Sequence, residues 1–264
     1  MTFDRAFAGA FRPHRFSAVP EVCGASFRPA HAGRIAVAFQ VVFVLYCVWS
    51  LGEEWNVTVV DRESWPRKER YEFFAGLAWP FWSVTFPVDV TGLHRWCRRR
   101  GVSFYYAMVH AVTQAMDGVE AFHYKDREGS IIRHDTLVPS FTDLRPGSED
   151  FYIVTMEAGA DMEAFCHKAR AASRTQKEFL PQGLWPEDQL IYLTSLPWLP
   201  ITALSNERDL TPWDSIPRAS WGKYMPDGDG REMLSLSLEL NHRLLDGIHV
   251  GQFYEKLNGI LEAL

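Results

Sequence analysis

Hydrophobic and polar residues alternate most regularly near the C-terminus of the chain. Between positions 234 and 240 every even residue is leucine and every odd residue is serine or glutamate. This period of two is typical of a β-strand with one buried face. Apolar residues then recur at helical spacing, including Ile248, Phe253 and Leu257, and predict a C-terminal helix.

His242 continues the even-numbered, apolar side of this strand, so the pattern predicts an imidazole that points into an apolar interior. Four residues later Asp246 precedes Gly247, and glycine has the backbone freedom that a tight turn needs. The turn brings a carboxylate near the imidazole. A histidine on an apolar face is more often a core residue bonded to backbone, and this alternative stays open beside a functional role.

From residue 57 onward the chain mixes short strands with amphipathic helices. The pattern predicts strands at 57–60, 81–86, 131–132, 138–141, 151–156, 189–195 and 218–224, and helices at 65–74, 89–100, 104–116 and 161–177. Ser64 is expected to cap the first helix, and Gly101 to close the second. The sequence DGDG at 227–230 predicts a hairpin turn. We therefore expect an α/β fold, with a mixed β-sheet and helices packed against it.

An apolar segment of 17 residues, 35–51, precedes this pattern and is slightly short for a membrane span. As a cleavable signal peptide it lies too deep in the chain. Three interpretations stay open: a membrane anchor, a start assigned upstream of the folded unit, and an element packed on the domain. The expected organisation is an N-terminal extension of uncertain order at 1–53 and a domain at 54–264.

Composition narrows the class of protein. The apolar content of 47% in 264 residues is sufficient for a sizeable core. The 27 basic and 33 acidic residues give a net charge of −6, so a nucleic-acid partner is not expected. The four cysteines form no CxxC pair, which favours free thiols in a reducing compartment and no metal site.

Several short motifs resemble those of one family. His242-xxx-Asp246-Gly247 matches the HxxxDG motif of the chloramphenicol acetyltransferase superfamily, and WPRKERYEF at 65–73 resembles the WxRxExFEF helix of that family. The motifs FY at 104–105, PQG at 181–183, LPW at 196–198 and KY at 223–224 follow in the family's order. The resemblance extends from near Val60 to the C-terminus and has no counterpart for residues 1–53.

The resemblance implies a two-layer α/β subunit that assembles as a homotrimer with active sites at the subunit interfaces. Members of the family transfer acetyl from acetyl-CoA to a hydroxyl group. We therefore expect acetyl-CoA as co-substrate, no metal, and a small acceptor alcohol such as chloramphenicol, which would place the protein in antibiotic resistance. A cytoplasmic location is expected, with membrane contact only through 35–51.

The resemblance also assigns catalytic residues. His242 corresponds to the general base, because a hydroxyl is a poor nucleophile until its proton is withdrawn. Attack on the thioester creates an oxyanion that needs a hydrogen-bond donor. The family uses a serine two residues before LPW, and the aligned residue here is Thr194. The family's aspartate–arginine pair implies that Asp246 binds Arg67 and orients the loop without transferring a proton.

Further residues are assigned to the two substrates. The acceptor contacts implied are Phe73, Phe74, Phe151, Leu180, Ser220 and Asn241, and the cofactor contacts are Tyr105, Tyr224 and Lys223. Several positions depart from the family: Phe74 replaces a usual tyrosine, Leu180 a phenylalanine, Ser220 a water-holding threonine, and Asn241 a common second histidine. Ser103 replaces a lysine near the cofactor phosphates, which predicts a lower affinity for CoA. Ordinary packing is the alternative for either tyrosine taken alone.

Three functions stay open from the sequence. The first is an acetyl-CoA-dependent O-acetyltransferase acting on chloramphenicol, a similar amphipathic alcohol, or a biosynthetic acceptor. The second is the dihydrolipoyl acyltransferase core of a dehydrogenase complex, whose DHRxxDG motif is close to residues 241–247. The WPRKE, PQG and LPW motifs favour the first. The third is a catalytically weak binding homologue, which the departures at Asn241, Thr194 and Ser103 would support.

Overall fold

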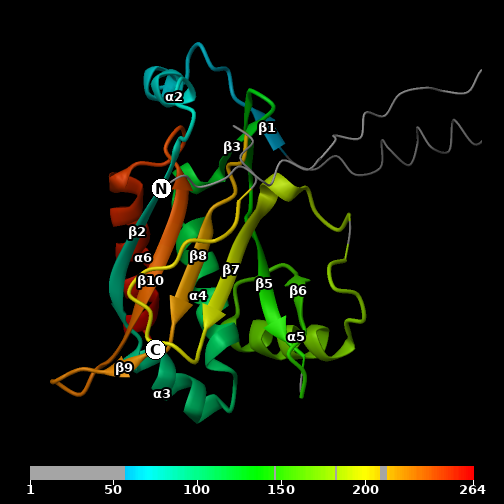
Figure 1. Cartoon of the computed structure of the whole chain (residues 1–264), viewed down its shortest axis with the longest axis vertical. Coiled ribbons are helices and arrows are strands. Elements are labelled where there is room, and N and C mark those ends of the chain that lie inside the picture. Colours follow the sequence, from blue (N-terminus) through cyan, green and yellow to red (C-terminus); the bar gives the residue numbers. More distant parts are fainter. Residues whose placement is uncertain (1–56, 146, 182, 209–212) are drawn as a thin grey trace, which may run out of the picture. The chain divides into compact units, whose positions relative to one another are not determined.

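The structure is a computed structural model of the chain, and it describes residues 57–145, 147–181, 183–208 and 213–264. These residues form an α/β unit in which helices cover one face of a large mixed sheet (Figure 1), as expected from the sequence. Within these ranges no helix is long and apolar enough to cross a membrane. The segment 35–51 lies outside the described residues, so the division into 1–53 and 54–264 stays a prediction.

The large sheet contains seven strands. Their bounds are β2 Phe81–Asp89, β5 Val138–Leu144, β6 Phe151–Thr155, β7 Leu190–Leu196, β8 Arg218–Gly222, β9 Met225–Pro226 and β10 Glu232–Asn241. The strand order is β2-β10-β8-β7-β5-β6, and β9 pairs with the start of β10. β7 runs parallel to β5 and β8, and the other neighbours are antiparallel. The hairpin turn expected at 227–230 lies between β9 and β10.

A small antiparallel sheet has the order β1-β4-β3. Its strands are β1 Val57–Val59, β3 Tyr124–Arg127 and β4 Ser130–His134. The hydrophobic pattern did not predict β3. Two adjacent charged residues, Lys125 and Asp126, are both buried there, so the strand has no alternation of polar and apolar positions.

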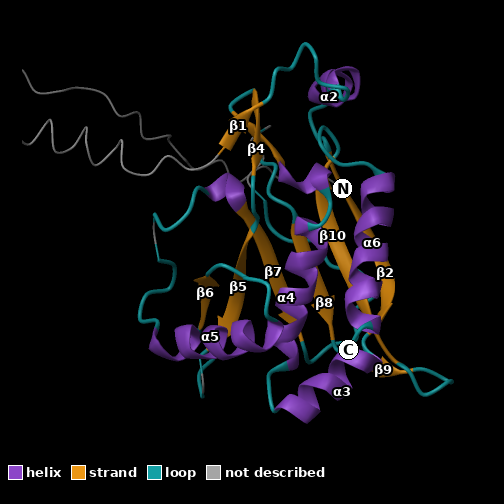
Figure 2. Cartoon of the chain, turned by 180° about the vertical axis from the view of Figure 1, so that it is seen from behind, coloured by secondary structure: helices purple, strands orange, loops and turns teal. Residues whose placement is uncertain are grey.

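Four helices pack on one face of the large sheet (Figure 2). They are α3 Thr91–Arg100, α4 Phe104–Asp117, α5 Met162–Thr175 and α6 Gly247–Glu262. α4 is largely buried and packs against both α5 and α6. α3 ends at Gly101, whose φ of +66° is accessible to glycine without strain. The side chain of Asp161 accepts a hydrogen bond from the N–H of Ala164 and caps α5.

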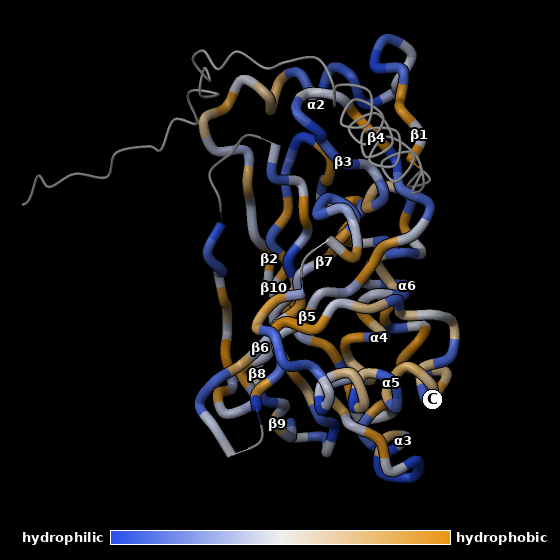
Figure 3. The backbone as a smooth tube through the Cα atoms, turned by 90° about the vertical axis from the view of Figure 1, so that its right-hand side faces the viewer, coloured by the Kyte–Doolittle hydropathy of each residue, from blue (hydrophilic) through white to orange (hydrophobic). Residues whose placement is uncertain are grey.

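β10 is covered on both of its faces, by apolar packing on one and by hydrogen bonds from a neighbouring segment on the other. Its even-numbered leucines, Leu234 to Leu240, are at most 2% exposed and face the helices. On the other face the N–H of Leu204 donates to Oγ of Ser237 at 3.2 Å, and the amide of Asn206 donates to Glu239 at 2.6 Å. Among the described residues, hydrophobic stretches include α4 and parts of the large sheet (Figure 3).

Two expectations at the ends of elements are wrong. Ser64 does not cap a helix, because its hydroxyl binds the Asp61 carboxylate at 2.8 Å, and α2 spans Lys68–Ala75 with Arg67 at its start. β10 ends at Asn241, and the N–H of His242 donates to the carbonyl of Pro80 at 2.7 Å, just beyond the ladder. His242 therefore leaves the strand and does not enter the apolar interior.

Candidate active site

The turn between β10 and α6 is held by one arginine from the start of α2. The guanidinium of Arg67 forms two hydrogen bonds with the Asp246 carboxylate, one of them between Nη2 and Oδ1 at 2.7 Å. Its Nε donates to the carbonyl of Arg243 at 3.0 Å, and Nη2 donates to that of His242 at 3.1 Å. The implied Asp246–Arg67 pair is thus present. Because one planar group binds the carboxylate and two carbonyls, it fixes the backbone from His242 to Asp246.

Asn241 and Arg243 hold the same turn from inside the unit. Asn241 is 2% exposed; its amide donates to the carbonyl of Asp214 at 2.9 Å, and its Oδ1 accepts from the N–H of Arg243 at 3.0 Å. Arg243 in turn binds the buried carboxylate of Asp126 at 3.2 Å. Since the nitrogen and the oxygen of the Asn241 amide are both hydrogen-bonded within the chain, we do not propose Asn241 as a contact to the acceptor.

The imidazole of His242 lies between two aromatic rings. Phe74 stacks on it with 3.9 Å between centroids and 9° between planes, and the Trp82 ring lies at 5.2 Å. Nδ1 lies 3.1 Å from Oδ1 of Asp246 but is not aligned with it, and has no hydrogen-bond partner among the described residues. The side chain is 33% exposed, and Nδ1 is buried. The opposite edge, which carries Nε2, is therefore the part open to a second molecule.

The charges around the turn favour an ionised Asp246. Hydrogen bonds from Arg67 hold the pKa of this carboxyl below its ordinary value. The N–H of Asp246 donates to Nδ1 of His249 at 2.9 Å. Burial and the nearby Arg67 charge lower the pKa of His249, so its ring remains a neutral acceptor in the first turn of α6.

A pocket with a volume of about 850 Å³ opens on the sheet face opposite the helices. Its lining includes residues from β5, β6, β7 and β8, from segments 179–181 and 183–187, and from 206–208. Thr194, Phe151 and Leu180 all line it, so three of the assigned residues come together here. Oγ1 of Thr194 lies 2.9 Å from Oγ1 of Thr142. The pocket is of a size that suits a small organic acceptor.

His242 and Thr194 of one chain do not face each other. Thr194 pairs with Ser220 and Ser220 with Ser237, so Thr194 is level with Ser237 of β10. His242 lies five residues beyond Ser237, just past the end of β10, and two strands across from Thr194. Strand spacings of ~3.4 Å along the chain and ~4.8 Å between strands place the two Cα atoms about 20 Å apart. Among the described residues that line the pocket, none belongs to the 242–246 turn.

Two other assigned acceptor residues lie in contrasting surroundings. Ser220 is 1% exposed and its Oγ accepts a hydrogen bond from Nδ2 of Asn206 at 2.9 Å. Phe73 is 68% exposed on α2 and meets the ring of Phe74 edge-on. Phe73 is therefore available to a molecule beside His242, whereas Ser220 lies beneath the surface of the sheet.

Tyr105, assigned to the cofactor, is partly buried and packs against the core. Its hydroxyl donates to the carbonyl of Thr142, and its ring contacts Phe141 and Trp221. Burial raises the pKa of the hydroxyl. These contacts agree with the alternative of ordinary packing.

Tyr224 and Lys223 lie at the surface just after β8. Lys223 is exposed, and Tyr224 is half-buried with its hydroxyl 3.1 Å from Nε2 of His94. Nδ1 of His94 lies 2.5 Å from the Glu232 carboxylate. A tyrosine ring beside an exposed ammonium group can contact a molecule that carries both an aromatic ring and phosphates.

Sequence reasoning missed several residues that the structure brings to these sites. Trp82 reaches His242 because β2 pairs with β10, with Trp82 opposite Leu240, and no local pattern specifies that pairing. His94 reaches Tyr224 from α3, and no local pattern specifies that contact either. Arg218 also lines the pocket, and no motif in the sequence singled it out.

Comparisons with known proteins agree with this architecture. Residues 55–258 match the family model described as chloramphenicol acetyltransferase. The chain is 27% identical over 212 residues to chloramphenicol acetyltransferase 3 of Escherichia coli, covering 79% of this chain and 98% of the relative. It is 25% identical over 204 residues to the Clostridium perfringens enzyme, covering 75% and 91%.

Solved structures share the fold. A chloramphenicol acetyltransferase matches with a TM-score of 0.67 at 23% identity, over 79% of this chain and 100% of the other. A probable dihydrolipoamide acetyltransferase from Listeria monocytogenes matches with a TM-score of 0.54 at 15% identity, over 75% and 92%. The family match covers most of the chain, and the protein therefore belongs to the chloramphenicol acetyltransferase family of acyltransferases.

Proposed function

We propose that the protein transfers acetyl from acetyl-CoA to a hydroxyl of a small amphipathic alcohol, with His242 as general base. Chloramphenicol is the first acceptor to test, because the similar enzymes are named as chloramphenicol acetyltransferases. An alcohol from a biosynthetic pathway is the alternative acceptor. The proposal rests on the way in which neighbouring residues hold His242 in place. Its ring is fixed between Phe74 and Trp82, its backbone is tied to Arg67, and one edge is open.

In the proposed reaction, Nε2 of His242 takes the proton of the acceptor hydroxyl as its oxygen bonds to the thioester carbonyl carbon. The imidazolium then returns that proton to the departing sulfur as the carbon–sulfur bond breaks. The products are an acetyl ester and the free thiol of CoA. Asp246 and Arg67 do not move a proton; they keep the turn in place.

Thr194 is proposed to stabilise the oxyanion. Either hydroxyl of the Thr142–Thr194 pair can donate in their 2.9 Å contact. When Thr142 donates, the proton of Thr194 is free to point into the pocket. A donor already fixed in position stabilises developing charge without reorganisation, which is why one such group has a large effect on rate.

The two halves of the site are proposed to meet between subunits. The separation of about 20 Å within one chain rules out joint action of its own His242 and Thr194. If His242 of each subunit reaches the Thr194 pocket of the next, the interface is heterologous, and three copies close into a ring. Tyr224 and Lys223 would then bind the cofactor, with Phe73 and Phe74 beside the acceptor.

Release of CoA thiol in the presence of acetyl-CoA and chloramphenicol tests the proposal. His242→Ala should lower the rate by about 10²–10⁴-fold without changing the assembly mass. His167→Ala, on the exposed side of α5, is the matched control and should leave the rate unchanged. Near-normal turnover by His242→Ala would contradict the mechanism. Chloramphenicol binding without turnover would favour another acceptor or a weakly active homologue.

A further inference from the structure

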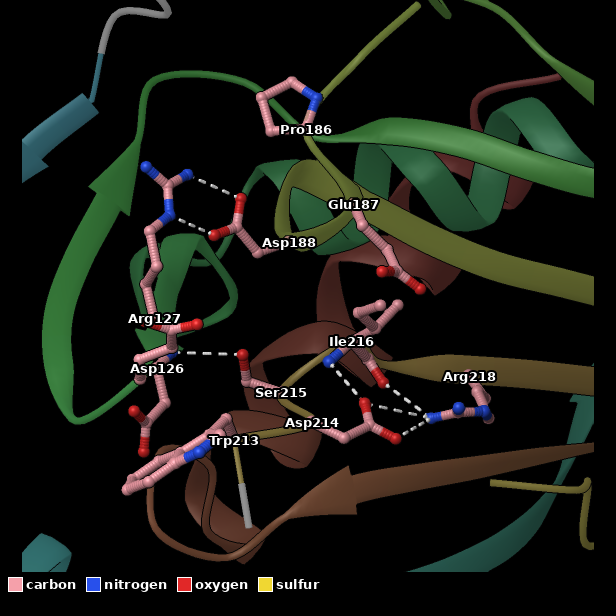
Figure 4. A pocket seen from close by; sticks show the side chains of 11 residues that line it. Asp126, Arg127, Pro186, Glu187, Asp188, Trp213, Asp214, Ser215, Ile216 and Arg218 are labelled. Carbon is pink, nitrogen blue, oxygen red and sulfur yellow. Dashed lines mark hydrogen bonds and ion pairs between the residues drawn. The ribbon is translucent and has the colours of Figure 1, made fainter. Parts of the chain in front are cut away.

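Two buried arginines line the Thr194 pocket. The side chains of Arg208 and Arg218 are 3% and 8% exposed, and both bind the carboxylate of Asp214, which is 6% exposed. The distances from Nη1 to Oδ2 of Asp214 are 3.0 Å and 3.1 Å. Figure 4 views Asp214 and Arg218 from a smaller adjoining cavity, where the carboxylate faces the guanidinium. One carboxylate therefore serves two guanidinium groups.

Both arginines have N–H groups that donate no hydrogen bond to any described residue. Nη2 of Arg208 is buried without a partner. The hydrogen bonds of Arg218, to Asp214 and to the carbonyl of Ile216, all come from Nη1. A guanidinium has five N–H donors, and a buried donor without an acceptor is destabilising. For Arg208 that cost falls on an atom enclosed by the chain, whereas Nε and Nη2 of Arg218 are not enclosed and remain for an oxygen acceptor brought by a ligand.

The other carboxylates near the pocket do not accept hydrogen bonds from these N–H groups. Glu239, whose charge attracts Arg208, instead accepts from the N–H and the side-chain amide of Asn206, at 2.7 Å and 2.6 Å. Glu187 and Glu207 are exposed, where solvent ions screen their charge. The buried acids, Asp214 and Glu239, are thus already hydrogen-bonded within the chain, and the acids that line the pocket, Glu187 and Glu207, lie at its exposed side.

Strand register relates these donors to Thr194. Arg218 is two residues before Ser220, which pairs with Thr194 on the neighbouring strand. The Cα atoms of Arg218 and Thr194 are therefore about 8 Å apart. An alcohol whose hydroxyl lies at Thr194 can place a second group, one aromatic ring away, at the arginines.

We propose that the natural acceptor carries a carboxylate, which Arg218 and Arg208 bind while the hydroxyl lies at Thr194. This inference rests on the proposed function, because it concerns the same pocket. A carboxylate accepts two parallel hydrogen bonds from a guanidinium fork, so the pair gives orientation as well as affinity. The acceptor class is therefore a hydroxylated organic acid.

The test is isothermal titration calorimetry of the full chain with 4-(hydroxymethyl)benzoate and 4-(hydroxymethyl)benzamide, which differ in charge but little in shape. The protein carries His242→Ala, so binding is measured without turnover. We expect the carboxylate to bind at least about tenfold more tightly than the amide. Arg218→Met should abolish the preference and Arg218→Lys should reduce it. Arg231→Met removes an exposed arginine from the β9–β10 hairpin and should preserve it.

Equal affinity for the two probes, or no measurable binding of the carboxylate, would overturn the inference whether or not any variant folds. A preference that survives Arg218→Met would also overturn it. So would weaker binding of acetyl-CoA in Arg218→Met with unchanged probe binding, since the arginines would then serve the cofactor. The proposed function has a separate test: it would fail if the wild-type protein transferred no acetyl group to an alcohol.

Discussion

At the scale of single residues, Thr194 is the most informative departure from the family's motifs. The pocket places its hydroxyl beside that of Thr142, on a β-branched side chain with few rotamers. Thr194→Val removes the hydroxyl and keeps the shape, so steady-state kinetics should show turnover reduced about 10²–10³-fold with little change in KM for the acceptor. Thr194→Ser should retain activity. Equal rates for Thr194→Val and wild type would mean that another group stabilises the oxyanion.

The motifs identified the residues proposed for the site but not their surroundings. His242, Asp246 and Arg67 could be singled out because their motifs resemble those of the family, and the structure brings the three residues into contact. The burial of Asn241 and the packing of Tyr105 could not be predicted, because both depend on contacts with residues distant in sequence. The stacking of Phe74 on His242 likewise needs α2 to lie beside the end of β10.

At the scale of elements, the Arg67–Asp246 pair joins α2 to the start of α6. Arg67→Ala and Asp246→Ala should each lower the melting temperature and the activity, because each leaves one charge unpaired. The cost should be about 3 kcal/mol, at the low end for a buried pair, since Asp246 is 27% exposed. The double variant should be less impaired than the sum of the singles. Additive losses across this thermal-melting cycle would mean that the two residues do not interact.

The same pair predicts a pH dependence of stability. The pKa of Asp246 is lowered from 3.8 by Arg67, so its contribution is present above pH ~4 and is lost as the pH falls through the native pKa. The difference in melting temperature between wild type and Asp246→Asn should therefore be largest at pH 5–7 and shrink near pH 3. A difference that grows toward acid pH would contradict this sign.

Element prediction succeeded where one period extended over several turns or residues. The alternation at 234–240 became β10, and the helical spacing at 161–177 became α5. It failed where tertiary contacts set the boundary. The predicted helix starts at residue 65, whereas α2 begins three residues later. The reason is that Trp65 is buried in the core and Arg67 binds the turn that follows β10. Ile248 continued the helical spacing but is 66% exposed, which the pattern alone could not indicate.

At the scale of the whole molecule, the described unit has a continuous core of its own. A fragment that begins at Glu54 should therefore fold and retain activity, with the same assembly mass as the full chain by light scattering. Aggregation of the fragment, when the full chain stays dispersed, would place 35–51 within the folded unit and contradict the boundary at 54.

The central claim of this account is that His242 of one subunit acts on a substrate held at Thr194 of another. The most direct measurement is the activity of trimers assembled by co-expression of two separately tagged variants, His242→Ala and Thr194→Val. Each variant alone should be nearly inactive. In a mixed trimer, one interface combines an intact His242 with an intact Thr194, so random assembly should restore about one quarter of the wild-type sites. No recovery above the two parent variants would contradict a site shared between subunits.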